Sequence, residues 1–252
     1  MLAIDTPAVT PMRGGLLQVA EVITTDGAGG ILLNGVTYNA HLCGKNRTVP
    51  AEGQQKTFDE QVVMSGTPFS LYRGVEGAML VERERALEEA QSAYSAGESY
   101  GVERGLQTTV LSPMAVDITP TPGTAVTNHR HALGLLEQYA ADNYSGLPVI
   151  SGNRLAVGYI PELRVSDDSF LLHTIHGTPV ISAAGYSTDG PGAAVAGAGQ
   201  AWLYVSGKIT VWKGPGGNYE AYDLEGNRVY ALAEATYVTT VECFAAAILV
   251  GI

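Results

Sequence analysis

The clearest pattern of apolar and polar positions in the chain predicts a long helix over residues 79–111. Small and apolar residues recur there at spacings of three and four, which is the period of one face of a helix. They are Leu80, Leu87, Ala90, Tyr94, Gly97 and Gly101. On the polar side, Arg85 is placed to pair with Glu82 and with Glu89. A helix of about thirty residues is about 45 Å long, so we expect a spine of the fold rather than an ordinary surface helix.

Glycines interrupt this helix at regular intervals. Gly97, Gly101 and Gly105 are four residues apart, and each costs about 1 kcal/mol relative to alanine inside a helix. We therefore expect a glycine ridge, which either lets another backbone pack closely or marks a bend.

The N-terminal part of the chain predicts an arm followed by a projecting loop. Pro7 and Pro11 forbid a regular helix in residues 1–27, so we expect an extended arm that folds only against something else. Residues 28–73 predict a long two-stranded loop. The loop begins with a predicted hairpin that has Asn34-Gly35 as its turn or bulge. Residues 39–66 are polar and irregular, and a returning strand is predicted at 68–72.

The C-terminal half predicts a second helix and many short strands. Thr127 or Asn128 can cap that helix, and Gly146 lies beyond its end. Apolar runs predict strands at 147–150, 170–173, 179–182, 201–205, 208–212 and within 228–250. Ser206-Gly207 predicts a turn between two of these strands, and residues 185–200 predict a loop. One long helix with scattered strands indicates an α+β fold.

Composition and charge narrow the function classes. A chain that is 46% hydrophobic and 15% charged is globular rather than disordered. Its net charge of −11, with no basic cluster, argues against direct nucleic-acid binding. The longest apolar run, 244–252, is about half a membrane span, and residues 1–15 lack a secretory signal, so we expect a soluble protein with no membrane contact. Cys43 and Cys243 lie far apart in sequence, and we expect reduced thiols rather than a disulfide framework.

The candidate chemical groups form no constellation that supports a reaction. His129 and His131 point apart on a helix, and the pair His173 and His176 is followed at once by Gly177 and Pro179. Cys43 lies two residues from His41, but side chains two apart on a strand share a face without necessarily meeting. Cys243 sits in an apolar run typical of a core residue. The remaining candidates are the glycine runs 197–199 and 214–217, which lack phosphate-loop spacing, and the acidic pairs 88–89 and 167–168, which suit solvated faces. We therefore predict no catalytic, cofactor-binding or metal residues, no cofactor and no enzymatic activity.

Local sequence features, in this order, resemble a known family. They are Lys56-Thr57-Phe58-Asp59, Pro68-Phe69 through Tyr72, Val102-Glu103 on the long helix, Leu135-Leu136-Glu137-Gln138-Tyr139, Gly177-Thr178-Pro179-Val180 with Gly185-Tyr186, and Gly207 to Trp212. Together with the order of elements, they resemble the major capsid proteins of tailed double-stranded DNA phages, which have the Hong Kong 97-type fold. The likeness is greatest to the short capsid proteins of phages that infect actinobacteria, and it covers nearly the whole chain.

The resemblance implies an organisation and a function. It implies an N-terminal arm at 1–27, an E-loop at 28–73, the spine helix (about 76–111) with the first part of the P-domain at 74–124, an A-domain at 125–200, and the rest of the P-domain with the terminal strands at 201–252. It implies pentamers and hexamers of this chain that close an icosahedral virion shell around packaged DNA, assembled in the host bacterial cytoplasm. Separate scaffold, portal and decoration proteins are possible partners.

Two points stay open in the resemblance. No charged scaffolding segment precedes the arm in this sequence, so a scaffold is separate or already removed. Some relatives crosslink a lysine to an asparagine, for which Lys45, Lys56, Asn218 and Asn227 are the candidates, although no motif singles them out. The alternatives are an encapsulin-like nanocompartment, another virion component such as a tail or decoration protein, and a soluble hydrolase. Pro7 and Pro11 argue against the helical start of an encapsulin, and the missing nucleophile–base pair argues against a hydrolase.

Overall fold

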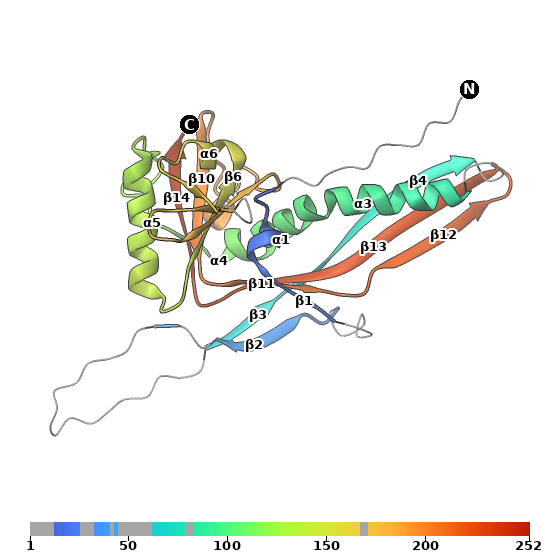
Figure 1. Ribbon diagram of the computed structural model, residues 1–252, viewed down its shortest axis with the longest axis horizontal. Helices are drawn as coiled ribbons and strands as arrows, with labels where there is room; N and C mark the ends of the chain where they lie inside the picture. Colours follow the sequence, from blue (N-terminus) through green and yellow to red (C-terminus); the bar gives the residue numbers. More distant parts are fainter. Residues whose placement is uncertain (1–12, 26–32, 41–42, 45–61, 79–82, 167–170) are drawn as a thin grey trace, which may run out of the picture.

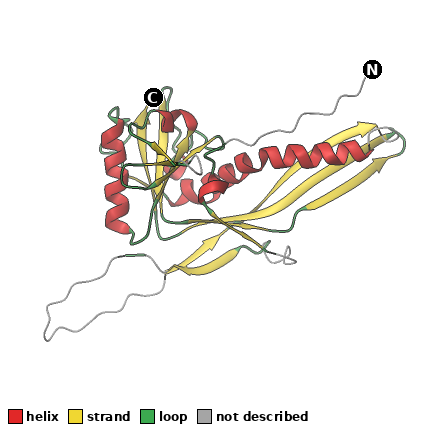
Figure 2. Cartoon of the chain, viewed as in Figure 1, coloured by secondary structure: helices red, strands yellow, loops and turns green. Residues whose placement is uncertain are grey.

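Two sheets and one long helix organise the chain (Figure 1, Figure 2). The computed structural model describes residues 13–25, 33–40, 43–44, 62–78, 83–166 and 171–252. A seven-stranded sheet with α5 on its outer face forms one end of the molecule, and a long helix lying along a five-stranded sheet forms the extended other end. This mixed architecture confirms the predicted α+β class.

The seven-stranded sheet is buried on both faces at its centre. Its order is β5 (Val116–Asp117), β14 (Ala245–Gly251), β10 (Gln200–Ser206), β6 (Val149–Asn153), β9 (Pro179–Ala183), β8 (Leu172–His173) and β7 (Arg164–Val165). Leu203 and Val205 of β10 pack toward α5 (His129–Asn143) and α6 (Arg154–Gly158), whereas Trp202 and Tyr204 pack into the core that the spine helix closes. Strands covered on both faces read as continuous apolar runs, which is why the sequence at 201–205 and 245–250 is apolar throughout.

The five-stranded sheet carries the long helix on one face. Its strands are β1 (Glu21–Thr24), β11 (Ile209–Lys213), β13 (Arg228–Val241), β12 (Gly217–Asp223) and β4 (Pro68–Ala78), with β4 paired along one side of β13. Helix α3 (Arg83–Leu106) packs on this sheet. Small side chains from both elements, Ala86 and Ala90 of the helix with Ala231 and Ala233 of β13, form the contact.

The predicted spine helix is confirmed, with different ends. Strand β4 continues through Ala78, so residues 76–78 are strand rather than helix, and residues 79–82 lie outside the described part of the chain. At the other end α3 continues as a π-helical turn (Gln107–Leu111) and a short helix α4 (Ser112–Met114) that contains Pro113. The second predicted helix is α5, and its cap is Asn128, whose side chain accepts a hydrogen bond from the His131 N–H at 3.2 Å.

The prediction that residues 1–27 contain no core element is wrong for residues 16–24. They form a short helix, α1 (Leu16–Val19), and strand β1, which pairs in parallel with β11. Leu16 is completely buried in the main core. Residues 1–12 and 26–27 of the predicted arm lie outside the described residues.

The projecting loop is two-stranded, but its pairing differs from the prediction. Strand β2 (Val36–Ala40) pairs with β3 (Val62–Gly66) in antiparallel register, so the returning strand is 62–66 and not 68–72. Residues 33–34 form a turn and Gly35 has φ +81°, but the strand that follows this turn pairs with residues 62–66, and residues 28–32 before it lie outside the described part. Lys45, Lys56 and the Thr57-Phe58-Asp59 motif also lie outside it.

The prediction of a tight turn at Ser206-Gly207 is also wrong. Strand β10 belongs to the seven-stranded sheet and β11 to the five-stranded sheet, so the chain crosses from one sheet to the other at this point. A Cβ at Gly207 would overlap the Glu242 carbonyl oxygen, so close backbone approach rather than turn geometry requires the glycine. Pro191–Ala193 forms a short 3-10 helix inside the predicted loop 185–200.

Candidate assembly surfaces

A buried carboxylate joins the N-terminal segment to the spine helix. Glu103 of α3 is 2% exposed, and its two oxygens accept four hydrogen bonds. Oε1 accepts from the Leu16 N–H at 3.1 Å and the Ser99 hydroxyl at 2.9 Å, and Oε2 accepts from the N–H groups of Ala184 at 3.1 Å and Gly185 at 2.9 Å. Three segments far apart in sequence therefore meet at one charged group, a bonding pattern that satisfies a buried carboxylate.

Two glycines make this junction possible. A Cβ at Gly15 would lie 2.6 Å from the Ser99 hydroxyl oxygen and 2.7 Å from Oε1 of Glu103. A Cβ at Gly185 would lie 2.6 Å from the Glu103 Cβ. Both backbones thus approach the helix more closely than a side chain would allow. We call Gly15, Leu16, Ser99, Glu103 and Gly185 the Glu103 junction.

The next helical turn holds the loop that follows β9. Gln107, which is completely buried, accepts from the Ser187 N–H at 2.6 Å and donates to the Asp189 carbonyl at 2.7 Å. The Tyr204 hydroxyl donates to the same carbonyl at 2.5 Å, and burial raises the pKa of Tyr204 to about 12. Gln107 is the first residue of the π-helical turn, a distortion that often marks functional positions.

At two of its three positions the predicted glycine ridge makes room for a close contact, but with side chains and not with the backbone that the prediction named. A Cβ at Gly101 would lie 2.7 Å from a methyl of Leu71, and a Cβ at Gly105 would overlap the Phe69 ring. Side chains of β4, rather than another backbone, therefore occupy the space that the ridge leaves. Gly97 has no atom within 4 Å of a built Cβ, so it has no such role.

A polar chain also ties the spine helix to the five-stranded sheet. The hydroxyls of Tyr94 and Tyr237 are 2.7 Å apart, the Tyr237 hydroxyl donates to Glu98 at 2.7 Å, and Lys213 pairs with Glu98 at 2.6 Å. Burial, followed by the hydrogen bond between Tyr237 and Tyr94, raises the pKa of Tyr237. The helix is thus held by directed bonds as well as by packing.

The two cysteines form a disulfide, so the prediction of reduced thiols without a disulfide is wrong. Cys43, just beyond β2, is bonded to Cys243, at the corner between β13 and β14. The corner places Cys243 at φ +66°, and Cys43 forms an isolated β-bridge with Tyr144. The sequence separation of 200 residues between the two cysteines hid this pairing from sequence reasoning.

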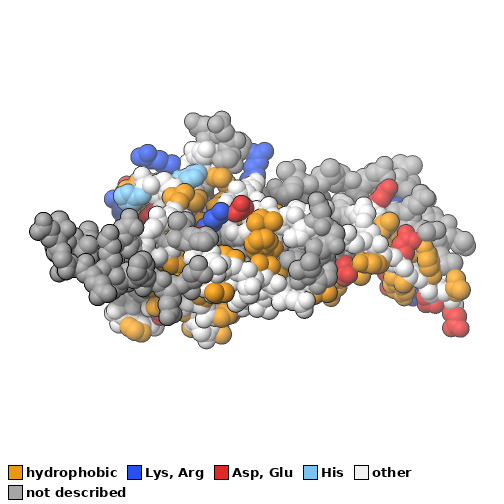
Figure 3. All heavy atoms as spheres, turned by 90° about the horizontal axis from the view of Figure 1, so that it is seen from below, with side chains coloured by type: hydrophobic (Ala, Val, Ile, Leu, Met, Phe, Trp, Pro, Cys, Tyr) orange, Lys and Arg blue, Asp and Glu red, His pale blue; other side chains and the backbone are white. Residues whose placement is uncertain are grey.

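The face of the five-stranded sheet that points away from α3 is exposed and rich in tyrosine. Tyr72 is 73% exposed, Tyr219 54% and Tyr230 39%. A shallow cleft of about 430 Å³ lies between β4, β13 and β12, and Leu232 and Glu76 are part of its lining. Figure 3 views the molecule from below and shows hydrophobic and acidic side chains mixed at this end. Exposed aromatic side chains grouped on one face of a sheet are typical of an interaction surface.

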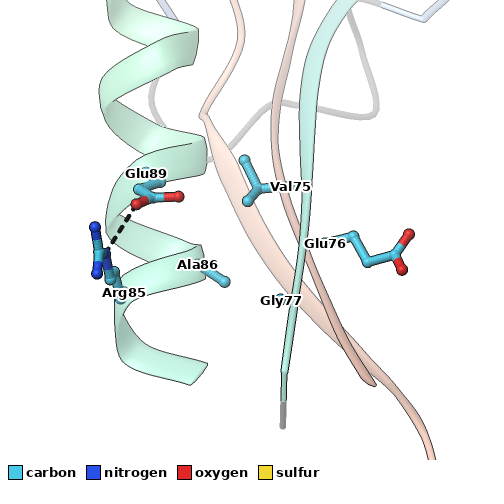
Figure 4. Close-up of a pocket in the computed structure, with 6 residues that line it drawn as sticks. All are labelled: Val75, Glu76, Gly77, Arg85, Ala86 and Glu89. Carbon is cyan, nitrogen blue, oxygen red and sulfur yellow. Dashed lines mark hydrogen bonds and ion pairs between the residues drawn. The ribbon is translucent and has the colours of Figure 1, made fainter. Parts of the chain in front are cut away.

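A second cleft lies at the start of the spine helix. Between the start of α3 and the end of β4, a cleft of about 130 Å³ is bordered by Val75 and Ala86, which point toward each other, while Glu76 points away (Figure 4). Arg85 pairs with Glu89 there at 3.0 Å, as the helical spacing predicts. Such an exposed pair contributes only a few tenths of a kcal/mol.

The histidine candidates do not converge. His129 stacks on Tyr159 with ring centroids 5.4 Å apart, at the start of α5, whereas His173 lies in β8. Within the described residues, no three His, Cys, Asp or Glu side chains are grouped so that they could hold a metal ion. Asp167 and Asp168 lie outside those residues, and Glu88 is an exposed side chain on α3. No helix within the described part is long and apolar enough to cross a membrane.

Comparison with known proteins finds likeness at the level of structure. Neither a protein-family model nor a curated protein sequence matches the chain. The capsid of a native GTA particle superposes with a TM-score of 0.58 at 13% identity, covering 99% of this chain and 96% of that one. The capsid of Ralstonia phage GP4 gives 0.58 at 8% identity, covering 98% and 94%. A chain from Microbacterium phage Oxtober96 gives 0.55 at 13% identity, covering 98% and 95%.

These superpositions define the class of fold. The chain has the fold of phage capsid proteins along nearly its whole length, as the sequence resemblance implied. The predicted likeness to capsid proteins of phages that infect actinobacteria agrees with this comparison, because a chain from a Microbacterium phage is among the matching structures. Sequence reasoning found the helix and its glycines, but it missed the role of Glu103. An acidic residue on an amphipathic helix gives no sign that it is buried, although Val102-Glu103 belongs to the motifs that carried the resemblance.

Proposed function

We propose that this chain is a major capsid protein that assembles into pentamers and hexamers and closes an icosahedral shell around a double-stranded DNA genome. It is a structural protein of the virion rather than an enzyme. The observation that carries the proposal is the match to capsid structures over 98–99% of this chain and at least 94% of each neighbour. The likeness therefore extends over nearly all of the residues in this sequence.

The surface of the folded chain supports association. Tyr72, Tyr219 and Tyr230 are exposed on one face of a sheet whose other face carries helix α3. Burying aromatic area is the usual source of binding energy at protein interfaces. The net charge of −11 gives enclosed DNA no basic surface to bind, so DNA is contained without sequence-specific contacts.

We assign the parts of the chain by the capsid fold. Residues 1–27 are the arm, of which 16–24 dock on the body. Residues 28–73 are the E-loop, and the loop ends in the first part of β4, which belongs to the five-stranded sheet. Residues 74–124 are the spine helix and the first part of the P-domain. Residues 125–200 are the A-domain near the centre of each pentamer or hexamer, and 201–252 complete the P-domain and the terminal strands. The arm and the E-loop reach neighbouring copies.

The test is to express the full chain in a bacterial cytoplasm, alone and with the neighbouring genes of its source, and to image the product by electron microscopy. The proposal predicts closed icosahedral particles, and particles from the natural source hold nuclease-protected DNA. Particles that enclose a folded protein instead of DNA would favour the nanocompartment alternative. A chain that stays monomeric at high concentration would contradict both.

Two deletions separate assembly from folding. Deleting residues 1–12 keeps Leu16 and the whole Glu103 junction, so the subunit should fold and stay soluble but fail to close shells. Deleting residues 1–20 also removes a completely buried leucine, so it should lower the stability of the subunit itself. Normal particles from the 1–12 deletion would show that the arm is not needed.

A further inference from the structure

The base of the projecting loop has little apolar contact with the body. We define the loop base as the described residues 33–40, 43–44 and 62–66. Within it only Gly66 is buried, while Val63 is 64% exposed and Leu33 62% exposed. A segment that buries so little surface gains little free energy from docking. Its position against the body must therefore depend on other contacts.

The Cys43–Cys243 bond is the strongest of those contacts. It joins the chain just beyond β2 to the corner between β13 and β14, one residue before Phe244. Beside it the Ser145 hydroxyl donates to the Gly44 carbonyl, and Cys43 bridges to Tyr144. These bonds all hold one short stretch of the loop base, residues 43–44, to one corner of the body.

The bond lies where solvent-borne thiols and disulfides can reach it. Cys43 and Cys243 are both partly exposed. Disulfides are rare in a reducing cytoplasm and persist in oxidising surroundings. If the chain is a capsid subunit, as proposed above, the same cysteines experience both environments, first during assembly in the cell and then in the released particle.

We propose that Cys43 and Cys243 form a redox-controlled fastener for the loop base, open as a dithiol during assembly and closed as a disulfide in the released particle. The oxidant is a low-molecular-weight disulfide such as oxidised glutathione. One cysteine thiolate attacks a sulfur of that disulfide and releases one glutathione thiolate, and the second cysteine thiolate then attacks the mixed disulfide and releases the other. Two protons pass from the protein thiols to the two glutathione thiolates, and two electrons reduce the glutathione disulfide.

The experiment compares the full-length protein, before assembly and as particles where these form, in reduced and in oxidised glutathione. Thiol titration in denaturant gives the number of free cysteines. Mass spectrometry of the intact chain gives the same information, because the disulfide form is lighter than the dithiol form by two hydrogen atoms. Hydrogen–deuterium exchange then follows the amides of β2 and β3. We expect exchange there to be faster by at least about tenfold in the reduced state, while the amides of α5 are unchanged. The double variant Cys43→Ser/Cys243→Ser in oxidising buffer should behave like the reduced protein.

The outcomes are distinguishable from those of the proposed function. Equal exchange of β2 and β3 in the two states, or thiols that stay free under the oxidant, would overturn the fastener whether or not shells form. A chain that shows the redox dependence but forms no shells would keep the fastener and contradict the capsid role. A double variant that matches the oxidised wild type would also overturn the fastener, because the loop base would then be held without the bond.

Discussion

Replacing Glu103 with glutamine tests the junction at the centre of the fold. The amide is nearly the same size, but its nitrogen is a donor and must face one of the two sets of donors that the carboxylate now satisfies. The Ser99 hydroxyl can rotate to accept a hydrogen bond, whereas a backbone N–H cannot. The amide nitrogen should therefore take the place of Oε1, which accepts from Leu16 and Ser99, and leave the Leu16 N–H without a partner.

The expected cost follows from these lost bonds. A hydrogen bond to a charged group contributes about 1.5–3 kcal/mol, and a buried donor left unpaired costs about 1–3 kcal/mol. The two figures describe overlapping aspects of the same loss, so we expect Glu103→Gln to lower the free energy of unfolding by about 2–4 kcal/mol. The bonds to Ala184 and Gly185 should persist, because the amide oxygen can still accept them.

Two measurements on the unassembled full-length subunit check this expectation. Urea unfolding gives the change in stability, and hydrogen exchange shows whether the Leu16 amide loses protection while Ala184 and Gly185 keep theirs. Glu88→Gln is the matched control, since it makes the same charge change at an exposed position of the same helix and should stay within about 0.5 kcal/mol. If Glu103→Gln lowers the free energy of unfolding no more than the control variant does, the carboxylate does not hold the junction.

Three further predictions address other contacts. Gly105→Ala should destabilise the subunit by about 1–3 kcal/mol in urea unfolding, because the added Cβ overlaps the Phe69 ring, whereas Gly97→Ala should stabilise it by up to about 1 kcal/mol. The reverse order of stability would show that Gly105 is not required by its contact with Phe69. The pKa of Tyr204 is about 12 in the folded protein against about 10 in the unfolded chain, so the stability that the neutral phenol contributes is complete below pH 10 and is lost as the pH rises toward 12. Tyr204→Phe should therefore lose less stability than wild type between about pH 9 and about pH 11.5, and equal losses would contradict the raised pKa of Tyr204. Asn128→Ala should cost about 1 kcal/mol by removing the α5 cap, and unchanged thermal unfolding would show that the cap is dispensable.

Sequence patterns predicted those parts of the fold that local physics determines. The period of α3 and the cap at Asn128 each depend on a few neighbouring residues, and both are present. The glycines of α3 were found in the same way, but the side chains that pack against Gly101 and Gly105 come from β4 and were not predicted. The apolar runs at 201–205 and 245–250 predicted strands because their burial on both faces leaves no polar alternation.

Long-range pairing escaped sequence reasoning. Strand β1 docks beside β11 across nearly 190 residues of chain, and Cys43 reaches Cys243 across 200. The identity of the strand that returns from the loop also depends on which partner it finds. Residues 62–66 pair with β2, while 68–78 pair with β13, and nothing in the local sequence distinguishes these two partners. Likewise, Glu103 is recognisable as a buried acceptor only once backbone N–H groups from two distant segments, at Leu16 and at Ala184-Gly185, surround it.

The most direct test of the account is electron cryomicroscopy of the purified full-length protein at assembly concentration. The account predicts closed icosahedral particles in which every subunit has the spine helix along the five-stranded sheet and buries the tyrosine face against another copy. Particles that leave Tyr72, Tyr219 and Tyr230 open to solvent, or a monodisperse monomer at every concentration examined, would contradict it.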